Sequence, residues 1–429
     1  MKKFIQAKLA FLSRKILKKY KPKVVAITGS VGKTSTKDAI YTVLNAAFPE
    51  RVAKSIENYN NELGLPLTII GAKAPGKSAF GWLQVFSQGV KLILGKIKNY
   101  PEILILEMAA DRPGDMDYLV NIARPNIAVI TSVGPSHLEF FESLEAIRKE
   151  KEKLVKAVSP DGLIVLNRDD PAVAAMKGRA STLKYGLLKD EERPSGEEVV
   201  ASDIRLVSGE GGLGFKLNYK GNSVPVHLPK IIGRHQIYAS LAAAAVGTYF
   251  KLNLIKISES LKDFQAPPGR MRLLPGIKNT LIIDDTYNAA PLSTIAALRT
   301  LAEITLPGKR KVAILGDMLE LGAATEAGHR KVGRVAHSMV DLLITVGDRA
   351  NFISDEARRA GMPEEKIIEY NYTDEVLEDI ENILKPNDVI LVKGSQAMRM
   401  EKIVKDIMFE PLAAEELLVR QNEEWVKKM

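Results

Sequence analysis

Cysteine is absent from this chain of 429 residues. Its absence excludes disulfides, thiolate metal ligands and cysteine nucleophiles, and it gives no information on the cellular compartment. No apolar run is long enough to span a bilayer, and the first residues are too charged throughout for a secretory signal. We therefore expect a cytoplasmic protein, and the N-terminal segment leaves association with a membrane surface open.

Acidic residues are missing from residues 1–23, which hold nine lysines and arginines. The formal net charge of the whole chain is +9, so the rest of the chain is neutral overall. The basic character is therefore local, and there is no RNA- or DNA-binding motif. We do not expect nucleic acid as a partner.

Residues 2–20 are predicted to form an amphipathic helix, because apolar residues recur at spacings of three and four. Two alternatives follow. The helix packs its apolar stripe on the next domain and leaves its lysines in water, or it makes a peripheral contact with an anionic membrane through residues 1–23. A second amphipathic stretch at 80–97 could cover this helix or share a surface with it.

Length and composition indicate two or three soluble globular domains, with 46% hydrophobic and 26% charged residues. From residue 23 onward, short β-branched runs alternate with helical stretches, which predicts a mostly parallel sheet covered by helices. The predicted strands are 24–28, 103–107, 127–131 and 163–166. Residues 196–230 are predicted to add antiparallel strands, and a helix is expected at 235–249.

Two prolines and a glycine in QAPPGRMR, residues 265–272, predict a hinge. Further strands are expected at 280–284, 311–315, 342–346 and 389–393. The predicted fold class is α/β, a central P-loop ATPase-like domain followed by a Rossmann-like domain. The predicted domains are a basic helix at 1–22, an ATP-binding domain at 23–265 and a C-terminal domain at 266–429.

A phosphate loop is predicted after the first strand, because a glycine turn there leads directly into a helix. Backbone N–H groups and the helix dipole favour phosphate at such a turn. Lys33 would reach the β- and γ-phosphates, and Thr34 would ligate Mg²⁺. The common first glycine of this motif is Ile27 here, and motor, kinase, GTPase and ligase all remain open. The predicted ATP-binding loop consists of Gly29, Ser30, Val31, Gly32, Lys33, Thr34 and Ser35.

Ten short segments together resemble the Mur ligase family, in its order and rough spacing. Within that family they look most like the branch that adds D-alanyl-D-alanine. The segments are TGSVGKTS (28–35), NYNNELGLP (58–66), LEMAADRPGDM (106–116), TSVGPSHLEFF (131–141), NRDDP (167–171), GRHQ (233–236), PGRM (268–271), DDTYNAAP (284–291), LGDMLELG (315–322) and VKGS (392–395).

The resemblance implies an ATP-dependent amide ligase of peptidoglycan precursor synthesis. ATP would phosphorylate a carboxylate of a UDP-muramoyl peptide, and the amine of D-alanyl-D-alanine would attack the acyl phosphate. The protein would position the groups and neutralise charge. The implied cofactors are ATP and Mg²⁺, and we expect a monomer.

The resemblance also implies metal ligands and catalytic residues. Thr34 and Glu107 would hold one Mg²⁺, and Glu107 ends a predicted strand, where open α/β sheets place their sites. His137 would bind a second Mg²⁺. Lys151 takes the place of the lysine that the family carbamylates, although Lys149 and Lys153 are close in sequence. The implied catalytic residues are Lys33, His137, Lys151 and Lys393.

The remaining implied contacts are with nucleotide and substrate. The ATP contacts are Asn60 and Arg270 at phosphate, Asp285 at the ribose, and Asn288 with Tyr287 beside the base. Asn61, Asp317, Glu320 and Ser395 are the implied substrate-binding residues, and Lys393 belongs to the same group.

The chain departs from the family pattern in two places. Ala239 stands where an asparagine helps to hold adenine, and Gln236 is a candidate to compensate. The family carries a separate N-terminal domain for the uridine nucleotide, whereas 22 residues precede the first strand here. That element is missing or replaced, for example by the basic helix with residues 80–97. Two alternative functions stay open: another amide ligase of the superfamily, akin to folylpolyglutamate or poly-γ-glutamate synthetases, and an inactive nucleotide-binding scaffold.

Overall fold

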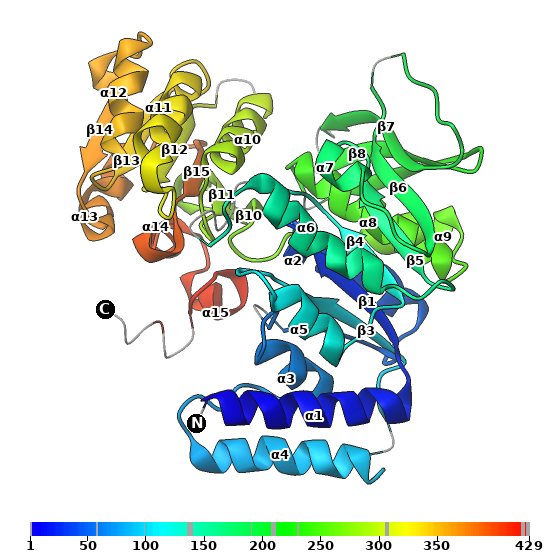
Figure 1. Ribbon diagram of the computed structural model, residues 1–429. Coiled ribbons are helices and arrows are strands. Elements are labelled where there is room, and N and C mark those ends of the chain that lie inside the picture. Colours follow the sequence, from blue (N-terminus) through cyan, green and yellow to red (C-terminus); the bar gives the residue numbers. More distant parts are fainter. Residues whose placement is uncertain are drawn as a thin grey trace. The chain divides into compact units, whose positions relative to one another are not determined.

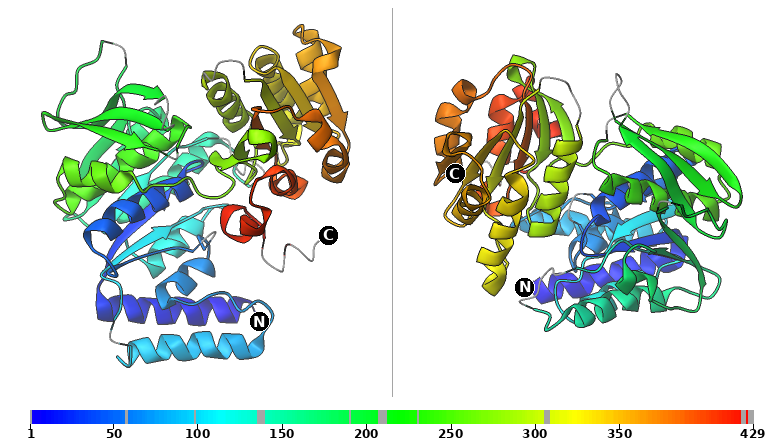
Figure 2. Two further views of the ribbon diagram at one scale, coloured as in Figure 1. Left: turned by 180° about the vertical axis from the view of Figure 1, so that it is seen from behind. Right: turned by 90° about the horizontal axis from the view of Figure 1, so that it is seen from above.

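Two sheets organise the computed structural model, which describes residues 2–56, 59–97, 99–134, 140–189, 191–206, 212–229, 231–304, 309–421 and 425. These residues form two compact units (Figures 1 and 2). The first takes its residues from 1–205, 214–229 and 235–264, and the second from 206–213, 230–234 and 265–429. An α/β fold built from a large, mostly parallel sheet and a second sheet confirms the predicted fold class.

The first unit is built on a nine-stranded sheet in the order β2-β3-β1-β4-β5-β6-β7-β8-β9. Every pair from β2 through to β7 is parallel. The bounds are β1 (Lys23–Thr28), β2 (Val52–Lys54), β3 (Ile103–Glu107), β4 (Ile127–Ile130), β5 (Leu163–Asn167), β6 (Ser181–Leu187), β7 (Val199–Leu206), β8 (Leu213–Tyr219) and β9 (Asn222–Leu228).

Helices cover both faces of this sheet. Val24 and Ala26 of β1 belong to the hydrophobic cluster of α1, α3, α5 and α6, whereas the alternating Val25 and Ile27 are buried on the other face. On that face α2 packs against α8 and α9. The bounds are α1 (Lys2–Tyr20), α2 (Lys33–Ala47), α3 (Gly64–Ile70), α4 (Ala79–Ile93), α5 (Asp115–Ile122), α6 (Leu144–Ala157), α7 (Pro171–Ala174), α8 (His235–Tyr249) and α9 (Leu254–Leu261).

The predicted antiparallel character of residues 196–230 is wrong for β7. This strand pairs in parallel with β6. A parallel pair requires a connection, here residues 188–198, that returns the chain to the end of the sheet where β6 begins. Alternating hydrophobicity predicts a half-buried strand but carries no information on its direction. The neighbours β8 and β9 are joined by the two-residue turn Lys220–Gly221, both with positive φ, which is the geometry of an antiparallel hairpin.

The predicted N-terminal helix is present as α1 and packs its apolar stripe into the first unit. Leu9, Leu12 and Ile16 are buried, so the packing alternative is confirmed for this stripe. The second amphipathic stretch forms α4 and lies beside α1 (Figure 1). The two helices approach closely at Gly89, where a Cβ would lie 3.0 Å from Leu12 Cδ1. None of the helices in the described ranges is long and apolar enough to cross a membrane.

The second unit is built on a six-stranded sheet in the order β10-β11-β15-β12-β13-β14. Strand β10 is antiparallel to β11, and the other pairs are parallel. The strands are β10 (Arg272–Pro275), β11 (Leu281–Asp285), β12 (Lys311–Gly316), β13 (Leu342–Val346), β14 (Ile367–Tyr370) and β15 (Val389–Lys393).

Two hydrophobic clusters lie on the two faces of this sheet. One cluster contains buried residues of α10, α11 and α12, and the other contains buried residues of α13 and α14. The helices are α10 (Pro291–Glu303), α11 (Thr325–Ala336), α12 (Asn351–Arg359), α13 (Thr373–Ile383), α14 (Glu401–Ile407) and α15 (Ala414–Leu417). Short 3-10 turns occur at Ile277–Asn279, Gly322–Ala324, Glu364–Lys366, Gln396–Met398 and Pro411–Ala413.

Candidate active site

The predicted phosphate loop connects the carboxyl end of β1 to the N-terminus of α2. Gly32 precedes the helix with a φ of 86°, a conformation that favours glycine. Gly29 has a φ of 153°, and a Cβ there would lie 1.9 Å from Thr131 Oγ1. The loop therefore passes against the end of β4 at a distance that only glycine allows. Ser35 is buried in the first turn of α2.

Residues that follow β4 hold this loop in place. The backbone N–H of Ser30 donates to the Ser132 carbonyl at 2.9 Å, and the N–H of Val31 donates to Ser132 Oγ at 3.0 Å. Thr131 Oγ1 donates to the Val31 carbonyl at 2.6 Å. No role was predicted for Thr131 or Ser132. Their position at the end of a predicted strand, in the segment TSVG, was the signal that could have found them.

A buried carboxylate joins two of the predicted site residues. Glu107 Oε2 accepts a 3.0 Å hydrogen bond from Thr34 Oγ1, and Glu107 Oε1 accepts one of 3.1 Å from Asn60 Nδ2. Lys37 Nζ lies 3.9 Å from the same carboxylate. Strands β1 and β3 are parallel neighbours with Ile27 opposite Glu107, which brings both carboxyl ends to one edge of the sheet. Hydroxyl and carboxylate oxygens are the ligand types that Mg²⁺ prefers, so this pair fits the implied ion.

Burial and the positive charge of Lys33, a residue of the phosphate loop, both affect the pKa of Lys151. Lys33 Nζ donates a 2.8 Å hydrogen bond to the Gly29 carbonyl, across the turn. Lys151 lies on the buried side of α6 with 3% of its surface exposed. Burial, followed by the positive charge of Lys33, lowers the pKa of Lys151 to about 7. An appreciable fraction of Lys151 is therefore a neutral amine near pH 7.

The neighbouring lysines have different environments. The side chain of Lys149 is 68% exposed. Lys153 donates to Asp117 at 2.7 Å and to Glu150 at 2.6 Å, and these partners raise its pKa although burial opposes them. Of the three lysines, Lys151 alone is buried, and this distinguishes it as the candidate for carbamylation.

Two further predicted site residues are His137 and Asn61. His137 lies outside the described residues, so its role as a metal ligand stays a prediction. Asn61 is described, and its Oδ1 accepts hydrogen bonds from the N–H groups of Leu63 and Gly64 at 3.1 and 3.0 Å. These bonds close a turn that leads into α3, and the contact of Asn61 with substrate stays a prediction. Ala239 is buried within α8.

In the second unit, Asp285 and Lys393 form an ion pair at the carboxyl ends of adjacent strands. They are directly opposite each other in the register of β11 and β15. Lys393 Nζ lies 2.6 Å from Asp285 Oδ2 and 2.9 Å from the Asn288 carbonyl oxygen. Lys393 is 2% exposed, so the pair is largely shielded from water. Asn288 itself is exposed.

The segments that follow β12 and β15 add three further predicted residues. Ser395 Oγ accepts from the Leu319 N–H at 2.8 Å, and the Ser395 N–H donates to the Asp317 carbonyl at 2.9 Å. Asp317 Oδ1 accepts from the Ala350 N–H at 2.7 Å, and burial raises the pKa of this carboxyl. Glu320 is exposed with a φ of 62°. The structure thus brings Asp317 and Ser395 together beside β15.

Two buried groups of the second unit were not predicted. His329 accepts at Nε2 from the Met318 N–H at 2.9 Å, and its Nδ1 lies 2.7 Å from the Thr325 carbonyl oxygen. This arrangement fits the neutral ring with its proton on Nδ1, and burial lowers its pKa. Asp284 is fully buried and accepts from the Gly269 N–H at 2.9 Å. Asp284 begins the segment DDTYNAAP, but the sequence did not show that its side chain is buried, and His329 lies in none of the motif segments.

Arg270, the predicted phosphate contact of the hinge, stacks over an aromatic ring. Its guanidinium carbon lies 3.9 Å from the centroid of the Tyr287 ring, a cation–π geometry. The Tyr287 N–H donates to the Gly269 carbonyl at 2.9 Å. Arg420 donates to the carbonyl oxygens of Tyr287 and Thr286. The hinge and the loop after β11 are therefore tied together within this unit.

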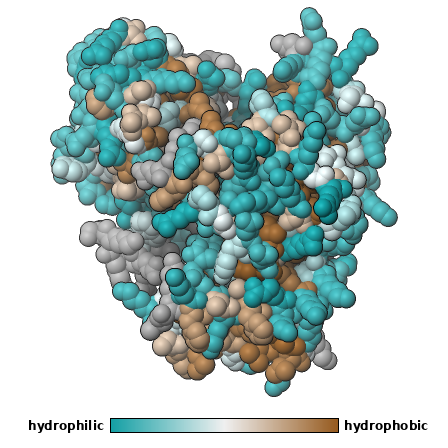
Figure 3. Space-filling model, viewed as in Figure 1, coloured by the Kyte–Doolittle hydropathy of each residue, from teal (hydrophilic) through white to brown (hydrophobic). Residues whose placement is uncertain are grey.

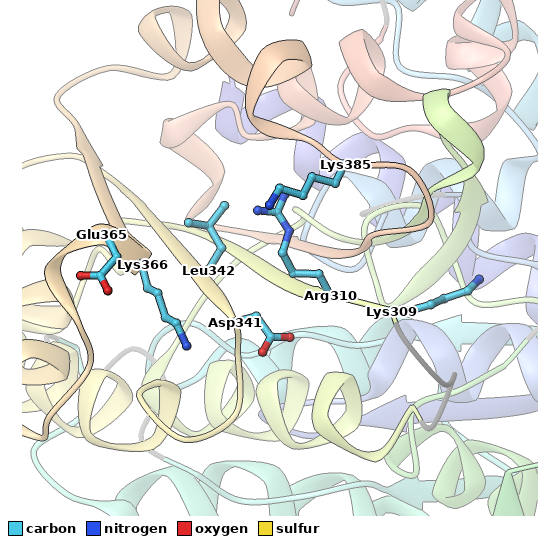
Figure 4. Close-up of a pocket in the computed structure, with 7 residues that line it drawn as sticks. All are labelled: Lys309, Arg310, Asp341, Leu342, Glu365, Lys366 and Lys385. Atoms are coloured by element: carbon cyan, nitrogen blue, oxygen red, sulfur yellow. The ribbon is translucent and has the colours of Figure 1, made fainter.

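A pocket of the second unit lies at the end of its sheet where β12 and β13 begin (Figure 4). It includes Leu342, where β13 begins, and Arg310, directly before β12. Arg310 is paired with Asp388 at 2.7 Å. None of the predicted site residues lines this pocket, whose lining is Lys309, Arg310, Asp341, Leu342, Glu365, Lys366 and Lys385.

Comparison with known proteins identifies the class to which this fold and site belong. The Mur ligase middle domain matches residues 27–80 and 86–247, and the Mur ligase glutamate ligase domain matches residues 269–396. The chain is a member of the Mur ligase family, and the resemblance carried by its motifs is confirmed.

The similar relatives are ligases of one branch. UDP-N-acetylmuramoyl-tripeptide--D-alanyl-D-alanine ligase of Bacillus subtilis is 30% identical over 94% of this chain and 79% of its own length. The crystal structure of MurF from Acinetobacter baumannii has a TM-score of 0.75 and 25% identity, covering 94% of this chain and 80% of that one. MurF from Thermotoga maritima in complex with ADP has a TM-score of 0.73 and 26% identity, covering 94% and 83%.

Proposed function

We propose that this protein joins D-alanyl-D-alanine to a UDP-N-acetylmuramoyl-tripeptide at the expense of ATP, in peptidoglycan precursor synthesis. The observation that carries the proposal is the buried Glu107 carboxylate, which holds Thr34 of the phosphate loop and Asn60 in one hydrogen-bonded group. Asn60 belongs to NYNNELG, the segment typical of the D-alanyl-D-alanine-adding branch. The substrate class follows the names of the relatives.

The proposed reaction has two steps. A carboxylate oxygen of the tripeptide attacks the γ-phosphorus, the bond to the β-phosphate oxygen breaks, and ADP leaves an acyl phosphate behind. The amine of D-alanyl-D-alanine then attacks the acyl carbon, and inorganic phosphate and one proton leave as the amide forms. Lys33 and the N–H groups of the loop neutralise phosphate charge.

Mg²⁺ fits the oxygen pair of Thr34 and Glu107, and when bound it neutralises phosphate charge during transfer. We propose that Lys151 is carbamylated to provide an additional oxygen ligand. Its neutral amine attacks CO₂, a new N–C bond forms, one proton leaves, and the buried amine becomes an anionic carbamate. The shielded position and the lowered pKa of Lys151 support this step.

In the second unit we propose that Asp285 binds the ribose, that Asn288 lies beside the base, and that Arg270 binds phosphate. Lys393, Ser395, Asp317 and Glu320 are proposed to meet the dipeptide or the acyl phosphate. The short connections among Asp285, Lys393 and Asn288 support a common site for these groups. The predicted monomeric state and the membrane contact of residues 1–23 stay predictions.

Phosphate release from ATP tests the function directly. With ATP and Mg²⁺ present, we expect phosphate release only when UDP-muramoyl-tripeptide and D-alanyl-D-alanine are both added, together with an amide product identified by its mass. Lys33→Met should abolish turnover, whereas Lys96→Met, at an exposed lysine, should not change it. Release that depends on glutamate or a folate would instead favour another ligase of the superfamily. No release with any pair would favour a scaffold.

A further inference from the structure

The outer side of α4 is apolar although nothing among the described residues covers it. Val85, Gly89 and Leu92 form the buried side of this helix. Phe80, Leu83, Val90 and Leu94 recur at helical spacing on the opposite side, and their exposed fractions are 69%, 63%, 45% and 63%. A water-facing helix ordinarily carries its charged residues on this side, whereas α4 contains a single charged residue, Lys91.

Helix α1, which packs beside α4, also exposes apolar side chains and mixes them with lysines. Phe4 and Phe11 are 61% and 53% exposed. Lys8 Nζ lies 4.4 Å from the ring centroid of Phe4, and Lys15 Nζ lies 5.5 Å from that of Phe11. We call the exposed sides of α1 and α4 the outer face. Figure 3 shows hydrophobic residues gathered along the lower edge of the first unit, where Figure 1 places α4.

The two segments that form the outer face carry charge of one sign. Residues 1–23 contain nine lysines and arginines, residues 71–101 contain five lysines, and neither segment contains an acid. The net charge of the whole chain is +9, so the rest of the chain carries a net negative charge. Positive charge is thus concentrated on the two segments that also expose large apolar side chains.

The two helices are fixed to each other, so the outer face is a preformed surface. Lys19 Nζ donates to the Ile93 carbonyl at 2.8 Å, which places a cation at the C-terminus of α4. Tyr20 Oη donates to the carbonyl oxygens of Leu92 and Ile97 at 3.0 and 2.8 Å. The Tyr20 ring stacks on Tyr100 with a centroid distance of 4.5 Å.

We propose that the outer face binds the surface of an anionic lipid bilayer, with α1 and α4 lying in the plane of the headgroups. Exposed phenylalanine and leucine would enter the boundary with the acyl chains, and the lysines would meet anionic headgroups. α4 has 15 residues, about 22 Å of helix, which is too short to span the hydrocarbon core. A second copy of this chain fits less well, because a two-fold contact would oppose two faces of the same positive charge.

Vesicle co-sedimentation of the full chain tests this proposal. We expect the protein to pellet with vesicles of two parts phosphatidylcholine to one part phosphatidylglycerol, but not with phosphatidylcholine alone, and added salt should weaken the binding. Residues 1–23 and 71–101 lie outside the proposed catalytic group, so binding should occur without ATP or substrate. Failure to pellet with the anionic vesicles at low salt would overturn the proposal, whatever the activity of the protein.

Substitutions separate the outer face from general adhesion. The double variant Phe80→Asp and Leu83→Asp should bind the anionic vesicles at least about tenfold more weakly. Ile255→Asp, at a 62% exposed position on α9, should bind like the wild type. Equal binding by the double variant and the wild type would contradict the proposed face. So would a concentration-dependent dimer that only the double variant lacks, because it would assign the face to a second copy.

Discussion

Thr34 Oγ1 donates a 3.0 Å hydrogen bond to Glu107 Oε2, although the two residues are 73 positions apart in the chain. The bond connects the first turn of α2 to the end of β3, and it holds the hydroxyl beside a carboxylate that is 2% exposed. This geometry places a hydroxyl oxygen beside a carboxylate oxygen, and both are ligand types that Mg²⁺ prefers.

Removing this hydroxyl is expected to reduce turnover strongly. In Thr34→Val the shape of the side chain is kept but a metal ligand and a hydrogen bond to Glu107 are lost. We expect kcat/KM to fall by about 100-fold or more, and the Mg²⁺ concentration for half-maximal activity to rise. Thr34→Ser, which retains the hydroxyl, should keep most of the activity. A Thr34→Val enzyme with wild-type dependence on Mg²⁺ would show that this hydroxyl is not a ligand.

Lys151 is expected to make activity depend on CO₂ and on pH. Carbamylation needs the neutral amine, and the pKa of Lys151 is lowered to about 7. As the pH falls through this value the amine gains a proton, so the carbamate and the activity should decline. Added bicarbonate should restore part of the activity near pH 7.

Matched variants at two neighbouring lysines control this experiment. Lys151→Met should lose activity and its bicarbonate response, whereas Lys153→Met removes a partly exposed ion pair and should retain both. If Lys153→Met alone lost the bicarbonate response, the assignment of Lys151 would be wrong.

The ion pair of Asp285 and Lys393 is expected to couple stability with activity. Lys393→Met leaves the Asp285 carboxylate without its 2.6 Å partner, and breaking a buried pair costs about 3 kcal/mol or more of unfolding free energy. The double variant Asp285→Asn with Lys393→Met should recover part of that loss, which a double-mutant cycle measures. Both single variants of this cycle, Lys393→Met and Asp285→Asn, and the double variant should ligate poorly.

A second ion pair in the same unit, between partly exposed Arg310 and buried Asp388, provides the control for this cycle. Arg310 and Asp388 form a 2.7 Å ion pair at the other end of the strands, where β12 and β15 begin. Arg310→Met should destabilise the second unit while, under conditions where it remains folded, turnover stays near the wild-type value. An Arg310 variant that is folded but as inactive as Lys393→Met would indicate that both activity losses reflect stability alone.

Asp284 is expected to make the second unit less stable as the pH rises from about 4 to 6. Burial raises the pKa of this fully buried carboxyl from 3.8 to about 6. The folded state therefore binds its proton more tightly than the unfolded state, and the stabilisation present below pH 4 is lost as the pH rises through the folded pKa. The loss corresponds to about 3 kcal/mol.

Replacing Asp284 removes this titration. We expect the unfolding free energy of Asp284→Asn, measured by chemical denaturation of the second unit, to improve relative to the wild type between pH 4 and 6. Thr286→Val removes a 2.6 Å hydrogen bond to the same carboxyl but leaves it titratable, so its pH dependence should persist. Parallel pH curves for Asp284→Asn and wild type would contradict the raised pKa.

Much of the fold could be predicted because its strands and helices have strong local signals. The β-branched runs at 103–107, 342–346 and 389–393 became β3, β13 and β15 with the predicted bounds, and the alanine-rich stretch at 235–249 became α8. The direction of β7 could not be predicted, because strand direction depends on how residues 188–198 return the chain. The buried role of Asp284 could not be predicted either, because two aspartates adjoin in DDTYNAAP and the sequence does not show which of them the fold buries. His329 lies in no motif segment, and its burial depends on how α11 packs.

The sequence by itself determined the phosphate loop, the α/β class and the membership of the Mur ligase family, since each depends on residues close together in the chain. Only the tertiary structure decided which of three neighbouring lysines is buried beside Lys33, and that Glu107 joins Thr34 to Asn60. It also decided that α4 exposes an apolar side. These facts depend on burial and on contacts between distant segments, and only the packing of the folded chain determines them.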